Sequence, residues 1–106
     1  QLLGVGLTSG VGRVVGGATG EQFLYRLYVP PGSTNLSVTM SGGTGDMDIY
    51  TQRATPPTTA AFTCRSWNGG NGESCVHASP ASGTWYILVD VYDGGAGATL
   101  VATRTP

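Results

Sequence analysis

Apolar and polar side chains alternate along several short stretches of this chain, and this alternation constrains its fold more than any other feature. The pattern is clearest at residues 36–41, and it recurs at residues 23–29 and 46–52. A period of two is typical of a β-strand with one buried face. Residues 84–92 are rich in β-branched and aromatic side chains, so this stretch is predicted to be a central strand.

Clusters of glycine and proline separate these strands. Pro30 and Pro31 end the strand at 23–29, because proline lacks the N–H group that a ladder needs. For the same reason the two prolines within 54–59 keep that segment out of any central strand. Residues 62–72 are predicted to form a long loop, and residues 93–95 a hairpin turn. Shorter strands are predicted at residues 5–8, 13–15, 75–78 and 98–103.

Roughly six to eight short strands with regular turn signals predict an all-β fold, an antiparallel β-sandwich of jelly-roll or Greek-key type. The chain has 18 glycines and no amphipathic run of helix-forming residues, so little or no helix is expected. Its 106 residues suit a single domain, in which residues 1–12 are a candidate N-terminal linker.

The charges and the apolar stretches of the sequence argue against nucleic acid and against a membrane span. Five cationic side chains, all of them arginine, face six acidic ones, so the chain has no basic stripe for nucleic acid. No apolar stretch approaches the roughly 18 to 20 residues that span a bilayer. The first residues lack the features of a signal peptide, so the chain is expected to be internal or C-terminal to a longer protein.

Cys64 and Cys75 are the only cysteines, and the segment between them is rich in asparagine and glycine. A turn there could bring them together, and an exported protein would oxidise them to a disulfide. Two free thiols in a cytosolic protein remain the alternative. A zinc site is disfavoured, because His77 is the only histidine and no second cysteine pair exists.

Few residues could support catalysis. His77 lies two residues from Cys75, which favours a surface or edge histidine over a member of a catalytic triad. Asp46 and Asp48 share one strand face, a spacing compatible with a calcium site or with a two-carboxylate hydrolase. The third interpretation is structural: Asp46 bonds the preceding glycine turn, and Asp48 bonds a loop amide or an arginine.

Four aromatic side chains are candidates for an exposed platform that stacks on sugar rings or on the prolines of fibrous proteins: Trp67, Tyr50, Tyr28 and Tyr92. Trp67 is the strongest candidate, because it lies in the polar loop that carries the cysteines. The alternative is that Trp67 folds back to cap one end of the sandwich. Trp85 is predicted to be a core residue.

Four segments in order resemble the signature of the bacterial pre-peptidase C-terminal domain: SGGTGDMDIY at 41–50, CRSW at 64–67, NGESC at 71–75 and GTWYI at 83–87. Met47 and Asp90 depart from the commoner pattern, and a charge at Asp90 needs a partner or an exposed edge. The resemblance implies a β-sandwich appended to secreted bacterial serine or metallopeptidases.

In that family the domain is commonly removed during maturation, and some members help to bind insoluble collagen, keratin or chitin. The resemblance therefore implies a secreted, extracellular, non-catalytic accessory domain whose first partner is the catalytic domain of its parent peptidase. A carbohydrate-binding module of a polysaccharide-degrading enzyme is the alternative. Related collagen-binding domains of clostridial collagenases bind calcium partly through an acidic N-terminal linker, whereas the first 20 residues here contain no acid. No other cofactor is expected.

Overall fold

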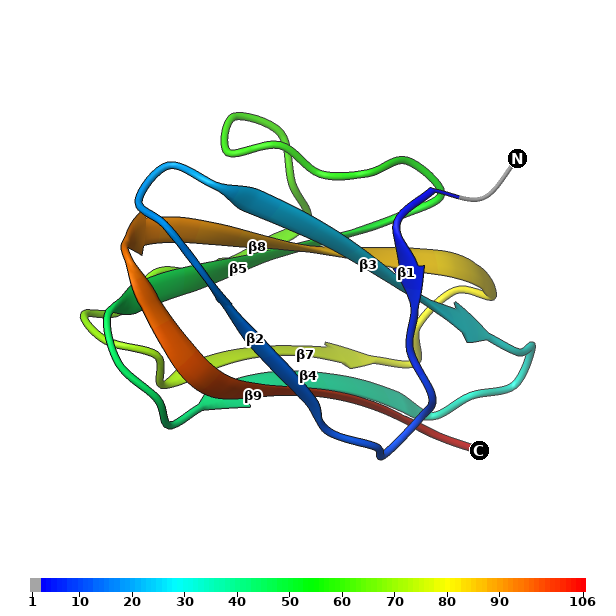
Figure 1. Ribbon diagram of the computed structural model, residues 1–106. Coiled ribbons are helices and arrows are strands. Elements are labelled where there is room, and N and C mark those ends of the chain that lie inside the picture. The colour runs from blue at the N-terminus through cyan, green and yellow to red at the C-terminus, as the bar shows by residue number, and fades with distance from the viewer. Residues whose placement is uncertain (1–2) are drawn as a thin grey trace.

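The strands form two β-sheets that pack face to face in the computed structural model, which describes residues 3–106 (Figure 1). The first sheet has the order β1-β3-β8-β5-β6, and the second has the order β2-β9-β4-β7. All pairings are antiparallel except that between β1 and β3. The predicted β-sandwich is confirmed. The strand bounds are β1 Val5–Gly6, β2 Arg13–Gly17, β3 Gln22–Val29, β4 Asn35–Ser41, β5 Asp46–Arg53, β6 Cys64–Ser66, β7 Glu73–Ala78, β8 Gly83–Asp93 and β9 Gly95–Thr105.

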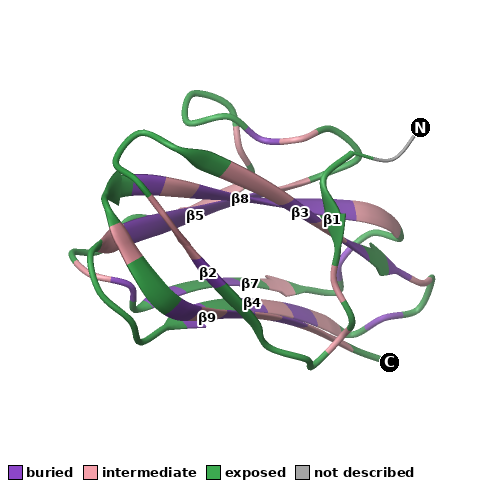
Figure 2. Ribbon diagram, viewed as in Figure 1, coloured by how far each residue is buried: buried purple, intermediate pink, exposed green. Residues whose placement is uncertain are grey.

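The core lies between the two sheets and is built from the alternating positions that the sequence marks as apolar (Figure 2). Trp85, predicted to be a core residue, is buried there, and its indole Nε1 donates a hydrogen bond to the Ala81 carbonyl. No helix among residues 3–106 could cross a membrane. The fully buried large side chains are Leu36, Met40, Met47, Ile49, Ile87, Leu100, Val29, Val38, Val89 and Val91.

Nearly every connection crosses from one sheet to the other. In the described part of the chain, only β5 and β6 are consecutive strands within one sheet. The predicted hairpin at residues 93–95 is therefore wrong: β8 ends at Asp93 in the first sheet, and β9 begins at Gly95 in the second. Alternation reports which face of a strand is buried but not which neighbour the strand pairs with, so it could not reveal this corner.

The predicted long loop at residues 62–72 contains a short strand, β6, which pairs with β5 through Ile49 and Ser66. The N-terminal strands are short, and β1 pairs with β3 through Val5 and Tyr25. Of the segment 1–12 that was expected as a linker, residues 1 and 2 lie outside the described part. Residues 54–59 contain no strand, as their prolines predict.

A disulfide closes one open side of the sandwich. Cys64 lies on β6, an edge strand of the first sheet, and Cys75 lies on β7, an edge strand of the second. Their Cα atoms are 6.0 Å apart, a usual separation for this bond. The predicted disulfide is confirmed, and it positions the loop that crosses between the two sheets at residues 67–72.

Candidate functional site

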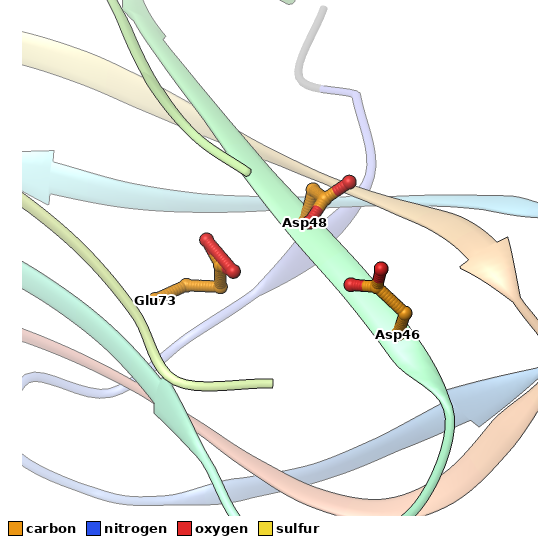
Figure 3. Close-up of side chains that lie close together, drawn as sticks. All are labelled: Asp46, Asp48 and Glu73. Atoms are coloured by element: carbon orange, nitrogen blue, oxygen red, sulfur yellow. The ribbon is translucent and has the colours of Figure 1, made fainter. Parts of the chain in front are cut away.

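Three carboxylates from two different sheets meet beside this disulfide-closed seam. Asp46 and Asp48 extend from β5, and Glu73 points towards them from β7 (Figure 3). One carboxylate oxygen from each residue lies within 4.8 Å of the other two. Asp48 is 6% exposed and Glu73 is 3% exposed, so two of the three carboxylates are withdrawn from water.

Local structure explains this meeting. The pairing of β6 with β5 ends at Ile49, so the first residues of β5 have no β6 neighbour. The Asn71 side chain takes that place: its Oδ1 accepts a hydrogen bond from the Met47 N–H at 2.7 Å, and its Nδ2 donates to the carbonyls of Gly42 and Thr44. Two residues later the chain enters β7 with Glu73 turned towards β5.

The charges in this acidic cluster, defined as Asp46, Asp48 and Glu73, are poorly compensated. Burial raises the pKa of Asp48 to about 7, and the charges of Asp46, Glu73 and Asp90 add to the rise. Burial also raises the pKa of Glu73, although hydrogen bonds from Ser66 and from the Asn68 N–H oppose that rise. Among the described residues, Asp46 Oδ1, Asp48 Oδ1 and Glu73 Oε1 are buried without a hydrogen-bond partner.

The sequence grouped Asp46 with Asp48 but missed Glu73. The expected bonds from these two acids to a glycine turn, a loop amide or an arginine are not among the hydrogen bonds of residues 3–106. Glu73 could not be found from spacing, because it lies on another sheet. The one feature of the sequence that could have indicated Glu73 is its position two residues before Cys75, in the segment that the disulfide closes. Asp90, as expected, has a partner, because its Oδ1 accepts a hydrogen bond from Gln22 Nε2 at 3.0 Å.

His77 lies on the edge strand β7, as predicted, but its ring is half-buried and points inward. The ring centroid is 4.5 Å from that of Trp85, and Nε2 is 2.9 Å from Thr51 Oγ1. Burial lowers the pKa of His77. This histidine thus contacts an aromatic ring and a hydroxyl, and within residues 3–106 no carboxylate is hydrogen-bonded to it as in a catalytic triad.

The aromatic candidates divide into two groups. Trp67, Tyr92 and Tyr28 are 62%, 71% and 57% exposed, respectively. Tyr50 is only 4% exposed, so its assignment to an exposed platform is wrong. The reason is the segment between β5 and β6, whose Phe62 packs edge-to-face on the Tyr50 ring at 5.4 Å. The alternation of apolar and polar residues within a strand does not predict that a loop covers the outer face of the same sheet.

Comparison with known families agrees with this architecture. The family model of the bacterial pre-peptidase C-terminal domain matches residues 22–90. An extracellular protease of Xanthomonas campestris is 44% identical over 84% of the chain, and an alkaline serine exoprotease A of Vibrio alginolyticus is 34% identical over 91%. A zinc metalloprotease of Helicobacter pylori is 33% identical over 79%. The chain spans only 15%, 18% and 32% of these three relatives, respectively.

Solved structures share the fold. The solution structure of vEP C-ter 100 superimposes with a TM-score of 0.77 at 30% identity, and the match covers 94% of this chain and 99% of that one. The pre-peptidase C-terminal domain of a Bacillus anthracis collagenase superimposes with a TM-score of 0.67 at 16% identity over 93% of this chain and 91% of that one. The second likeness concerns the fold alone.

Proposed function

Because the chain belongs to the bacterial pre-peptidase C-terminal domain family, a family of small non-catalytic domains, we propose that it holds the catalytic domain of a secreted peptidase at an insoluble protein substrate. The observation that carries the proposal is a pair of exposed aromatic side chains, Trp67 and Tyr92, at one end of the first sheet.

The strand register supports the placement of this pair. Trp67 directly follows Ser66, which pairs with Ile49 near the start of β5. Tyr92 lies between Val91 and Asp93, which pair with the first two residues of β5. Trp67 and Tyr92 therefore flank the beginning of β5 from the two strands on either side of it. Neighbouring strands lie about 4.8 Å apart, so the backbones that carry the two rings are roughly 10 Å apart, a span that side chains of one extended polymer can bridge.

The Trp67 side chain is also restrained by contacts within the unbound domain. The Arg65 guanidinium carbon lies 3.2 Å from the centroid of the Trp67 ring, and it lies 5.0 Å from that of Phe62. The loop is further restrained by the disulfide that follows it. A side chain that is already ordered loses little conformational entropy on binding, which is what an anchoring residue requires. The alternative in which Trp67 caps the end of the sandwich is at odds with its high exposure.

The class of parent enzyme and of polymer is inferred from the relatives. Their names include both serine and zinc proteases, so either class is a candidate parent. Protease names favour a protein substrate such as collagen or keratin over the alternatives of chitin or other polysaccharides. Secretion of the parent fits the disulfide, because such bonds persist in oxidising compartments.

A sedimentation assay tests the proposal. The oxidised domain is mixed with insoluble collagen, keratin, chitin and cellulose, and the bound fraction is measured for the parent sequence and for Trp67→Ala and Tyr92→Ala. The matched control is Tyr28→Ala: this tyrosine is similarly exposed but pairs with Thr84 at the opposite end of the sheet. Loss of an aromatic anchor is expected to weaken binding by about ten-fold or more.

Binding to collagen or keratin that is weakened by Trp67→Ala or Tyr92→Ala, but not by Tyr28→Ala, would support substrate anchoring. Binding only to chitin or cellulose would replace it with a polysaccharide-binding role. Failure to bind any of the four polymers would also contradict anchoring, and a role in the maturation or secretion of the parent would then explain the domain better.

A further inference from the structure

We propose that Asp46, Asp48 and Glu73 form a binding site for a hard divalent cation, and that this cation is Ca²⁺. The site lies where β5 of the first sheet faces β7 of the second. Cation binding uses neither aromatic side chain as a ligand and does not require substrate anchoring, so either proposal can fail without the other.

The first argument is that buried carboxylate oxygens lack hydrogen-bond partners. Asp48 and Glu73 are both more than nine-tenths buried, and each turns an oxygen without any hydrogen-bond partner into the acidic cluster. Buried polar atoms are nearly always paired, and a buried unpaired charge is strongly destabilising. Three neighbouring carboxylates that each carry such an atom call for a shared cationic partner.

The second argument is charge. Each charged group that acts on Asp48 is another acid: Asp46, Glu73 and Asp90. Asp90 pairs directly with Asp48 across the strands, and Asp93 pairs with Asp46. All acidic residues of the chain except Glu21 therefore gather around the start of β5. A divalent cation would remove this repulsion at its centre.

The third argument is the kind of ligand. The acidic cluster offers only carboxylate oxygens, which hard cations prefer, whereas a zinc or copper site would draw on histidine or cysteine. Both cysteines are joined in the disulfide. The ligand oxygens all lie within 4.8 Å of one another, close enough for one divalent cation to contact all three. Ca²⁺ accepts irregular sets of oxygen ligands, whereas Mg²⁺ demands near-ideal octahedral geometry and usually keeps several waters, so this set of three carboxylates favours Ca²⁺.

The proposed site needs no ligand from the N-terminal segment. Two ligands come from β5 and one from β7, so the cation would link the two sheets on the same side as the disulfide. Binding is therefore expected to stabilise the native state over the unfolded chain, in which Glu73 is far from Asp46 and Asp48.

Direct titration with metal alone tests the proposal. The domain is stripped with EDTA, dialysed at pH 7.5 and titrated calorimetrically with Ca²⁺ and with Mg²⁺. Tb³⁺ luminescence sensitised by nearby aromatic side chains, with displacement by Ca²⁺, gives a second readout. Thermal unfolding is recorded with and without each metal. The variants are Asp48→Asn and Glu73→Gln, which keep side-chain shape, and the matched control is Glu21→Gln, outside the acidic cluster.

The expected result is one Ca²⁺ per chain, tighter than Mg²⁺, with a rise in Tm on Ca²⁺ addition. Asp48→Asn and Glu73→Gln should raise the Kd roughly ten-fold or more and abolish the Tm rise, while Glu21→Gln leaves both unchanged. Circular dichroism of each variant without metal shows whether it is folded. Absence of binding at millimolar Ca²⁺, or binding that survives both cluster variants, would overturn the proposal.

Discussion

At the scale of single residues, Asp48 is a side chain whose charge opposes the fold when no cation is present. Burial and three neighbouring acids disfavour its ionised form. In EDTA at pH 8, Asp48→Asn is therefore expected to raise the free energy of unfolding by on the order of 1–2 kcal/mol. Urea denaturation measures this change. Asp93→Asn, on an exposed acid, should stay within about 0.5 kcal/mol of the parent. A destabilising Asp48→Asn would show that the carboxylate has a favourable partner.

His77 should make stability fall in mild acid. Burial against Trp85 and Thr51 lowers its pKa, so the fold favours the neutral ring. The unfolded chain takes up a proton near pH 6.5, whereas the native state resists it until the pH falls further. The contribution of His77 is thus complete above pH 6.5 and is lost as the pH falls through and below that value. Asp48 and Glu73, whose pKa values are raised, act with the opposite sign.

A variant separates the pH dependence of stability that His77 causes from that caused by Asp48 and Glu73. His77→Gln keeps an amide that can bond Thr51 but cannot titrate. The stability advantage of the parent over His77→Gln is expected to shrink by about 1 kcal/mol between pH 8 and pH 5, as measured by urea denaturation at each pH. An advantage that stays constant, or that grows as the pH falls, would contradict this assignment.

At the scale of elements, the corner between β8 and β9 depends on the absence of a side chain at Gly95. A Cβ atom there would lie 1.9 Å from the Thr44 carbonyl oxygen, a backbone atom that cannot move away cheaply. Gly95→Ala is expected to lower the free energy of unfolding by about 2–4 kcal/mol. The control is Gly69→Ala, in a loop where a Cβ atom meets nothing within 4 Å. Equal effects of the two substitutions in urea denaturation would show that the corner can adapt.

The disulfide links the two sheets covalently on the β6–β7 side of the sandwich. It closes a loop between residues separated by 11 positions, and such a closure contributes about 3 kcal/mol by restricting the unfolded chain. The double variant Cys64→Ser, Cys75→Ser should lose about that amount in urea denaturation. Reduction of the parent sequence should give the same loss. A double variant as stable as the oxidised parent would show that the seam is held by its other contacts.

The sequence predicts these elements unevenly, and the reason is physical. Alternation of period two located β3, β4, β5 and β8 and the buried face of each, because burial of one face is a local property. Strand partners depend on contacts between distant segments, so local patterns predict a hairpin at Gly94 and do not place Glu73 beside Asp46 and Asp48. The burial of Tyr50 cannot be predicted for a similar reason, since Phe62 covers its ring from another segment.

At the scale of the whole molecule, the path of the chain should make the two sheets unfold together. All connections except that between β5 and β6 lead from one sheet to the other, and the core consists of side chains from both. Neither sheet can therefore detach without exposing the apolar face of its partner. Amide groups in β8 of the first sheet and in β9 of the second are expected to exchange with solvent at free energies within about 1 kcal/mol of each other.

Native-state hydrogen exchange by NMR across low urea concentrations measures both strands in one experiment. Their exchange free energies should converge on the value from global unfolding, because the strands are protected by the same core. The short edge strands β1 and β6 serve as the internal comparison and should exchange sooner, since each pairs with the rest of its sheet on one side only. Protection that disappears from β9 at a lower urea concentration than from β8 would mean that the second sheet opens alone, and that the crossings do not enforce cooperativity.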